Sequence, residues 1–190
     1  VGLLVVIGLG LGYYYGIHRN GIDNATEMIG QADIALAQGN DSVALQQYLQ
    51  VADEYSNSIA NRANLNAAIL LYQQGKYEEA IKSVDNYDVN DELVGAAAAS
   101  LKGDCLVNLQ KYDEAISSFD KAISTSNNNA LYTPLFMMKK ATVLNAQQKY
   151  AEAAEIYTAI KEKYPKYLIA YRVNIDKYIE RANYLAGQTK

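Results

Sequence analysis

Small residues recur at a fixed spacing along most of this chain. In four places an alanine or glycine is followed twelve residues later by an alanine. The later alanines of successive pairs lie 36, 35 and 38 residues apart. Because small side chains are needed where two antiparallel helices approach closely, the pattern predicts four repeated helix pairs. The pairs are Ala32 with Ala44, Ala68 with Ala80, Gly103 with Ala115, and Ala141 with Ala153.

A turn signal separates the two helices of each predicted pair. The segments are Gly39-Asn40-Asp41, Gly75-Lys76-Tyr77, Gln110-Lys111-Tyr112 and Gln148-Lys149-Tyr150. Glycine or a long polar residue can end the first helix there. Asp41 and Asp91 are expected to cap the helices that follow them. The predicted pairs are 23–38 with 42–55, 59–74 with 77–87, 92–110 with 112–124, and 133–147 with 150–163.

An aromatic or branched residue stands four positions after each later alanine. These residues are Tyr48, Val84, Phe119 and Tyr157. The alanine-x-x-x-aromatic spacing, with one valine substitution, resembles the tetratricopeptide-repeat family. The resemblance implies an all-α fold in which residues 22–166 form a right-handed solenoid of about four helix pairs.

A further amphipathic segment follows the stop signal at Tyr164-Pro165. Apolar residues there recur every three or four positions, with charged residues between them. We predict one helix over residues 167–187 that caps the open end of the solenoid. In an alternative interpretation, tyrosines of this helix form a partner-binding stripe. The apolar series is Leu168, Tyr171, Ile175, Tyr178, Ile179, Ala182 and Leu185, and the tyrosines of the stripe are Tyr167, Tyr171 and Tyr178.

The first seventeen residues differ from the rest of the chain. Residues 1–12 carry no polar side chain, three tyrosines follow, and Arg19 comes just after the segment. Seventeen helical residues span roughly 25 Å, close to a bilayer core of about 30 Å. We therefore predict that residues 1–17 form the end of a transmembrane anchor with the tyrosines at the headgroup level. A cleaved signal peptide is disfavoured because no alanine-x-alanine-like site is present.

Gly8, Gly12 and Gly16 are spaced four residues apart on one face of this predicted anchor. Such a face allows close approach of another membrane helix. Glycine is also common in membrane helices without that role, so both interpretations stand. The anchor is followed by acidic rather than basic residues, which favours a repeat domain outside the cytoplasm.

Charge and residue inventory argue against several function classes. The formal net charge is −4, and no basic stripe interrupts the helices, so nucleic acid is not an expected partner. His18 is the single histidine and Cys105 the single cysteine. We expect no catalytic site, cofactor, metal or small-molecule substrate. An enzyme with its site near the loop 125–129, testable at Asp88 and Asp104, is the disfavoured alternative.

The tetratricopeptide resemblance also implies a binding surface. In that family six places of each first helix supply the concave face of the solenoid. Here the mixture of apolar and amide side chains predicts binding of an extended or helical peptide, without the basic residues of a carboxylate clamp. The assigned residues are Arg62, Leu65, Asn66, Ile69 and Tyr72 in the second pair, Leu101, Asp104 and Asn108 in the third, and Leu135, Met138 and Lys139 in the fourth. The remaining places hold Gln73, Ala97, Ser100, Val107, Thr142, Asn145 and Ala146.

A narrower resemblance covers nearly the whole chain. An amino-terminal anchor followed by about four repeats, the segments 129–135 and 175–182, and Gly103-Asp104 are similar to YfgM-like ancillary subunits of the SecYEG translocon. That resemblance implies a single-pass inner-membrane protein with its repeats in the periplasm. The implied partners are the SecYEG channel, a periplasmic chaperone of the PpiD type, and emerging client chains. The implied role is non-catalytic, with local concentration raised by tethering.

The same architecture also fits a second role. An envelope-assembly or outer-membrane biogenesis scaffold would need the same anchor and the same peptide-binding repeats. Only the identity of the partners distinguishes it from a translocon subunit.

Overall fold

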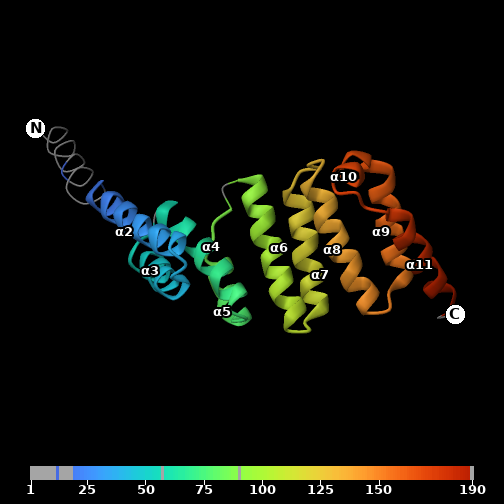
Figure 1. Cartoon of the computed structure of the whole chain (residues 1–190), viewed down its shortest axis with the longest axis horizontal. Coiled ribbons are helices and arrows are strands. Elements are labelled where there is room, and N and C mark those ends of the chain that lie inside the picture. Colours follow the sequence, from blue (N-terminus) through green and yellow to red (C-terminus); the bar gives the residue numbers. More distant parts are fainter. Residues whose placement is uncertain (1–11, 13–18, 57, 90, 189–190) are drawn as a thin grey trace, which may run out of the picture. The chain divides into compact units, whose positions relative to one another are not determined.

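The computed structural model describes residue 12 and residues 19–56, 58–89 and 91–188. All regular elements within these ranges are α-helices. The chain divides into two compact units, Val1–Tyr87 and Asp88–Lys190. Figure 1 shows their helices in chain order.

Unit 1 contains two antiparallel helix pairs. Each helix packs against the next one along the chain, and the two first helices, α2 and α4, also contact each other. The first pair is α2 (Arg19–Ala37) with α3 (Asp41–Glu54), and the second is α4 (Ser58–Gln73) with α5 (Tyr77–Asp85).

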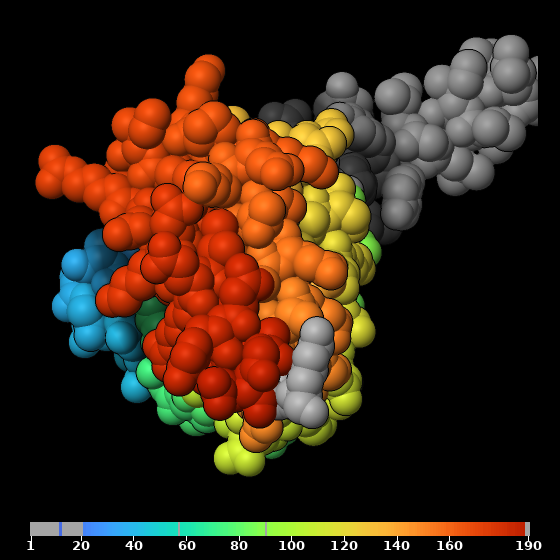
Figure 2. All heavy atoms as spheres, turned by 90° about the vertical axis from the view of Figure 1, so that its right-hand side faces the viewer, coloured from blue at the N-terminus to red at the C-terminus, as the bar shows by residue number. Residues whose placement is uncertain are grey.

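Unit 2 contains two further pairs and a carboxyl-terminal extension. Its last long helix, α11, packs against α9 and lies outermost at the end of this unit, as Figure 2 shows. A short helix, α10, also contacts α9. The pairs are α6 (Glu92–Asn108) with α7 (Tyr112–Thr125) and α8 (Tyr132–Ala146) with α9 (Tyr150–Lys163), and the extension is α10 (Pro165–Ala170) and α11 (Ile175–Gln188).

The repeated small residues lie where the helices of each pair meet. All seven repeated alanines have no exposed surface, and Gly103 is buried as well. The larger residue four positions later is buried in every pair, including Tyr48, Phe119 and Tyr157. Fully burying one such large apolar side chain stabilises a fold by about 1.5–3 kcal/mol. The sequence prediction of four close-packed helix pairs is confirmed.

Gly103 shows why one pair begins with glycine. A Cβ atom added there would lie 2.7 Å from the Phe119 ring, closer than real Cβ atoms approach a neighbour. Phe119 is itself 1% exposed and has little room to move. The absence of a side chain in α6 therefore makes space for the ring from α7.

The four turns within the pairs share one backbone conformation. Gly39, Gly75, Gln110 and Gln148 all have φ between 60° and 76°. At each turn the next amide donates to a carbonyl five residues before it, as in Lys76 N to Leu71 O at 2.9 Å. The amide of the left-handed residue itself donates to the carbonyl three residues before it. Together the two hydrogen bonds form a Schellman motif, which ends the first helix. The predicted turns are confirmed, with glutamine taking the left-handed place of glycine in unit 2.

Of the two predicted helix caps, one is confirmed and the other is wrong. Asp91 caps α6, because its carboxylate accepts from the amides of Leu93 and Val94 at 2.8 Å. The predicted capping role of Asp41 is wrong. Asp41 is the first residue of α3, and Asn40 precedes it without a capping side-chain bond. Asp41 still carries a negative charge in the first turn, where the helix dipole favours it.

The single helix predicted over 167–187 is also wrong, since α10 and α11 are separate. Arg172 has φ 52° after the end of α10, which a continuous right-handed helix does not allow. The spacing of apolar residues continues across this break and therefore hid it. Of the tyrosines in the alternative stripe, Tyr167 is 4% exposed and belongs to the core cluster, whereas Tyr171 and Tyr178 are exposed.

The predicted anchor over residues 1–17 lies outside the described residues, except for Gly12. Gly12 is helical and exposed, with no atom near the position of an added Cβ, while Gly8 and Gly16 are not described. Within the described ranges, no helix combines the length and apolar character needed to span a bilayer.

The packing at Gly103 gives the first testable prediction. Gly103→Ala should lower the free energy of unfolding by about 1–3 kcal/mol, because the new methyl group collides with the Phe119 ring. Gly30→Ala in α2 is the matched control, since nothing lies near its added Cβ, and it should stabilise by up to about 1 kcal/mol. Urea unfolding followed by circular dichroism measures both. Equal stabilisation by both alanines would contradict the packing argument.

Candidate binding surface

The assigned concave-face residues lie on the first helices α4, α6 and α8. In unit 1, Ile69 is 40% exposed and Leu65 and Tyr72 are half-buried. In unit 2, Leu135 is 36% exposed and Leu101 is half-buried. Each unit therefore presents apolar side-chain surface on its first helices, and the use of that surface in binding stays a prediction.

Two of the assigned apolar residues also have internal packing roles. The ring of Tyr72 lies 5.7 Å from the ring of Tyr77, measured between centroids, at the α4–α5 turn. Met138 packs against the buried cluster formed by α8, α9 and α11. Substituting either residue would therefore change packing as well as any contact with a partner.

A polar cluster joins three helices of unit 1. The Tyr48 hydroxyl donates to Asp33 Oδ1 at 2.6 Å, and the Arg62 guanidinium donates to the other oxygen, Oδ2. Burial, reinforced by the neighbouring Asp33 carboxylate, raises the pKa of Tyr48 to about 12. The charge of Arg62 is thus already balanced within the unit.

A second polar cluster lies in unit 2. Lys139 Nζ donates to the Asp104 carboxylate and to Ser100 Oγ, the latter at 3.2 Å, and it stands 6.0 Å from the centre of the Phe119 ring. Burial raises the pKa of Asp104, although the Lys139 ammonium acts in the opposite direction. Lys139, like Arg62, is therefore paired with an acid.

The two clusters have the same plan. Asp33 directly follows Ala32, and Asp104 directly follows Gly103, so both acids occupy one place of the repeat. Each acid binds a cation from the first helix of the next pair, α4 in unit 1 and α8 in unit 2. Because both cations are neutralised, neither is available to grip an acidic ligand without breaking an internal pair.

A small pocket lies at the carboxyl-terminal end of unit 2, and we call it the terminal pocket. It has a volume of about 270 Å³. The Asn145 amide nitrogen donates to the Tyr157 hydroxyl at 2.9 Å, and the rings of Tyr157 and Tyr178 are 5.4 Å apart. Asn145 Oδ1 is buried and has no hydrogen-bond partner within the described part of the chain. The lining residues are Thr142, Asn145, Tyr150, Tyr157, Tyr178, Arg181, Ala182 and Leu185.

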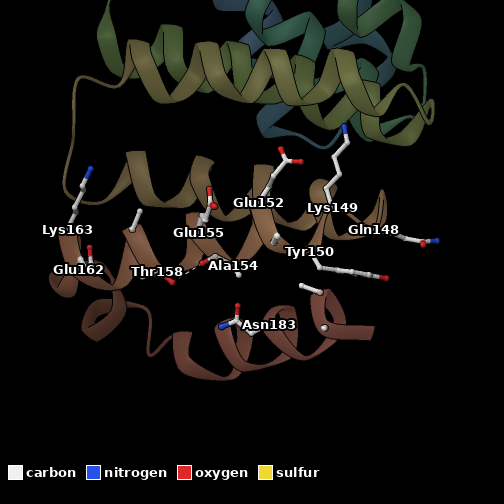
Figure 3. Close-up of a pocket in the computed structure, with 14 residues that line it drawn as sticks. Gln148, Lys149, Tyr150, Glu152, Ala154, Glu155, Thr158, Glu162, Lys163 and Asn183 are labelled. Atoms are coloured by element: carbon white, nitrogen blue, oxygen red, sulfur yellow. Dashed lines mark hydrogen bonds between the residues drawn. The ribbon is translucent and has the colours of Figure 1, made fainter. Parts of the chain in front are cut away.

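A larger cavity of about 850 Å³ runs along α9 and the end of α11, away from the assigned concave-face residues. Figure 3 shows Glu152, Glu155 and Thr158 of α9 along it, with Asn183 of α11 opposite. In the preceding pair the same face of α7 is covered, because Asp120, the counterpart of Thr158, binds Lys140 of α8 at 2.7 Å. The cavity therefore lies on the face of α9 that corresponds to the covered face of α7, and α11 covers that face only in part.

Cys105 lies in the buried interior of unit 2 rather than in a reactive site. It has no exposed surface, and burial, with a smaller contribution from Asp104, raises the pKa of its thiol to about 11. A reactive cysteine needs a lowered thiol pKa. Within the described ranges, no group of three or more histidine, cysteine or acidic side chains is placed to hold a metal ion.

Family comparisons agree with the helix-pair geometry. The tetratricopeptide repeat-like domain family matches residues 18–145, which is more than half of the chain, and the tetratricopeptide repeat family matches residues 136–167. The chain belongs to the tetratricopeptide-repeat family. The resemblance expected from the alanine and aromatic spacing is thereby confirmed.

One curated relative of this tetratricopeptide-repeat chain comes from Neisseria gonorrhoeae (strain ATCC 700825 / FA 1090). It is named "Ancillary SecYEG translocon subunit" and is 31% identical over 121 residues. The match covers 62% of this chain and 55% of the relative, so the chain spans about half the length of that protein. The resemblance to the ancillary-subunit family, inferred from the sequence, is confirmed at this level.

Solved tetratricopeptide-repeat structures show the same fold. The crystal structure of MamA superposes with a TM-score of 0.62 at 19% identity, covering 83% of this chain and 95% of MamA. YrrB, described as "a TPR protein with an unusual peptide-binding site", gives 0.61 at 17% identity and covers 91% of each chain. At these identities the likeness shows the fold alone.

Sequence reasoning missed two parts of these sites. Asp33 is not among the residues assigned from the sequence, although its register match with Asp104 signals an acid placed to meet the next first helix. Arg181 is one of the charged residues between the apolar positions of the terminal segment, and it lines the terminal pocket. Its role depends on the separate course of α11, which the continuous apolar spacing did not indicate.

The Asp104–Lys139 pair gives the second testable prediction. Lys139→Met should destabilise by roughly 1–3 kcal/mol, because it leaves a half-buried carboxylate without its cation. Adding Asp104→Asn to that variant should restore most of the loss. Urea unfolding of both single variants and the double variant gives the coupling energy. Simple additivity of the two single effects would show that the pair is not coupled.

Tyr48 gives the third testable prediction, on pH dependence. Tyr48→Phe should cost about 1 kcal/mol at pH 7, because the hydrogen bond to Asp33 is lost. An unfolded tyrosine ionises near pH 10, whereas Tyr48 in the folded protein has a pKa of about 12. The stabilisation that this raised pKa gives is complete below pH 10 and is lost as the pH rises towards 12.

The measurement is the difference in unfolding free energy between wild type and Tyr48→Phe, taken from pH 7 to pH 12. The other tyrosines titrate in both proteins, so their contributions cancel. The difference in unfolding free energy between the two proteins should become smaller above pH 10. A difference that stays constant over this range would mean that the Tyr48 pKa is not raised.

Proposed function

We propose that this chain is a non-catalytic, membrane-anchored scaffold whose repeats lie in the periplasm and bind protein partners at the Sec translocon. The observation that carries the proposal is the 31% identity to the ancillary SecYEG translocon subunit over 121 residues. The uncharged, hydrophobic start of the chain supports the single-pass inner-membrane anchor. A PpiD-type chaperone and emerging client chains are the proposed partners beside the channel.

The paired cations support a particular mode of binding. With Arg62 and Lys139 bound to acids, the exposed apolar surface at Ile69 and Leu135 is left as the main source of affinity on the first helices. Tetratricopeptide repeats are suited to such binding because their first helices form an extended surface. YrrB, with its peptide-binding site, gives a precedent for this use of the fold.

Anchoring increases the effect of modest affinity. A repeat domain held at the membrane meets partners at the channel at a high effective concentration, because the second contact is then intramolecular. The scaffold therefore needs no tight groove to keep a chaperone near an emerging chain. It needs an anchor and an apolar surface on the same molecule.

Affinity purification from mildly solubilised membranes gives the fourth testable prediction. The intact chain should retain the Sec channel and a periplasmic chaperone, identified by mass spectrometry, and a version lacking residues 1–17 should retain much less of the channel. The paired substitution Ile69→Ser and Leu135→Ser should reduce the chaperone and leave the channel bound. Ile34→Ser is the control, because Ile34 is 60% exposed on α2 but is not an assigned concave-face residue.

The outcomes separate the proposed role from its alternative. Recovery of envelope-assembly proteins without the channel would overturn the translocon role and support a biogenesis scaffold. Recovery that is unchanged by Ile69→Ser with Leu135→Ser would overturn the assigned binding face.

A further inference from the structure

We propose that the terminal pocket binds one acidic residue of a partner peptide, with its carboxylate facing Arg181. This inference rests on the proposed function, because it takes the peptide to lie along the first helices. It adds a specific subsite and a sequence preference that the repeat pattern alone does not provide.

The first step is the polar wall of the pocket at Asn145 and Tyr157. The Asn145 amide nitrogen donates to the Tyr157 hydroxyl, and both residues line the pocket. Asn145 Oδ1 is buried rather than exposed to the pocket, so the polar contact with a ligand falls to Arg181.

The second step is the charge of Arg181. Arg181 lines the pocket. Burial raises the pKa of Tyr157, and the positive charge of Arg181 acts in the opposite direction. Arg62 and Lys139 are each paired with an aspartate, but no carboxylate pairs with Arg181 within the described part of the chain. A carboxylate brought by a ligand would complete a charge-assisted hydrogen bond there.

The third step is the size and wall chemistry of the pocket. Its volume of about 270 Å³ lies below the roughly 300–1,000 Å³ of pockets for drug-sized ligands. Tyr178 and Leu185 provide ring and aliphatic surface from α11, and Tyr150 provides a ring from α9. This combination suits the methylene stem of one aspartate or glutamate with its peptide group.

The pocket also lies where a peptide on unit 2 would reach it. Thr142 and Asn145 occupy two of the six concave-face places of α8, the helix that carries Leu135 and Lys139. The opposite wall comes from α11, which takes the place of a next first helix against α9. The subsite is therefore made jointly by the last repeat and the carboxyl-terminal helix.

Selection from a random heptapeptide phage library on the full detergent-solubilised chain gives the fifth testable prediction. The peptides are displayed with blocked carboxyl ends, so a carboxylate can come only from a side chain. Selected peptides should be enriched in aspartate or glutamate beside apolar residues. The enrichment should disappear on Arg181→Gln and persist on Lys177→Gln, which removes the same charge from α11 outside the pocket.

Fluorescence anisotropy with one selected peptide then tests the contact itself. Replacing its acidic residue by the corresponding amide should weaken binding to wild type roughly tenfold and leave binding to Arg181→Gln unchanged. Thermal unfolding of each variant shows that these changes are not losses of fold.

The results distinguish the subsite from the wider proposal. If no peptide is selected at all, both the peptide-binding role and the subsite are overturned. If peptides are selected without acidic preference, or with a preference that survives Arg181→Gln, only the subsite is overturned. Peptides that bind only when a free carboxyl terminus is added would show that the pocket accepts a chain end, which also overturns the side-chain proposal.

Discussion

Close approach of two helices within each pair is the constraint on which the rest of the structure depends. Side chains as small as alanine at two facing places allow the helices to approach, and the ring or branched chain four residues later then fills the space beside them. In the third pair the Phe119 ring lies so close to Gly103 that even a methyl group there does not fit. Alanine stands in the pairs of the larger Tyr48 and Tyr157, so the placement of the ring, and not its volume, decides between alanine and glycine.

Most of the fold can be predicted because these requirements are local and repeated. Ala32, Ala68 and Ala141 with their partners, and the left-handed turns after the first helices, recur in register and reinforce one another. The break at Arg172 could not be predicted in this way, since the apolar spacing of Leu168, Tyr171 and Ile175 is the same in one helix or two. Backbone conformation at one residue decides that question, and periodicity does not report it.

The binding surface was less predictable than the fold because it depends on pairing between repeats. Register correctly places Arg62, Asp104 and Lys139 on first helices, but only the structure shows that each cation meets an acid of the preceding pair. An arginine or lysine that the sequence assigns to ligand binding is therefore already paired with an internal acid. Desolvation reinforces this pairing, because a half-buried carboxylate such as Asp104 is costly to leave alone.

The need to bury apolar side chains explains the carboxyl-terminal helix at the end of the repeats. α9 needs a cover for Tyr157 and Ile160, and α11 supplies one through Ile175 and Ala182 while leaving the far side of α9 open. On α8, Thr142 occupies the place that Asp33 and Asp104 occupy on α2 and α6, so α8 offers no acid there to a cation of α11. Arg181 is consequently a cation that the repeat arrangement does not neutralise. The end of a repeat array is therefore where charge selectivity can arise in a fold whose internal repeats pair their own charges.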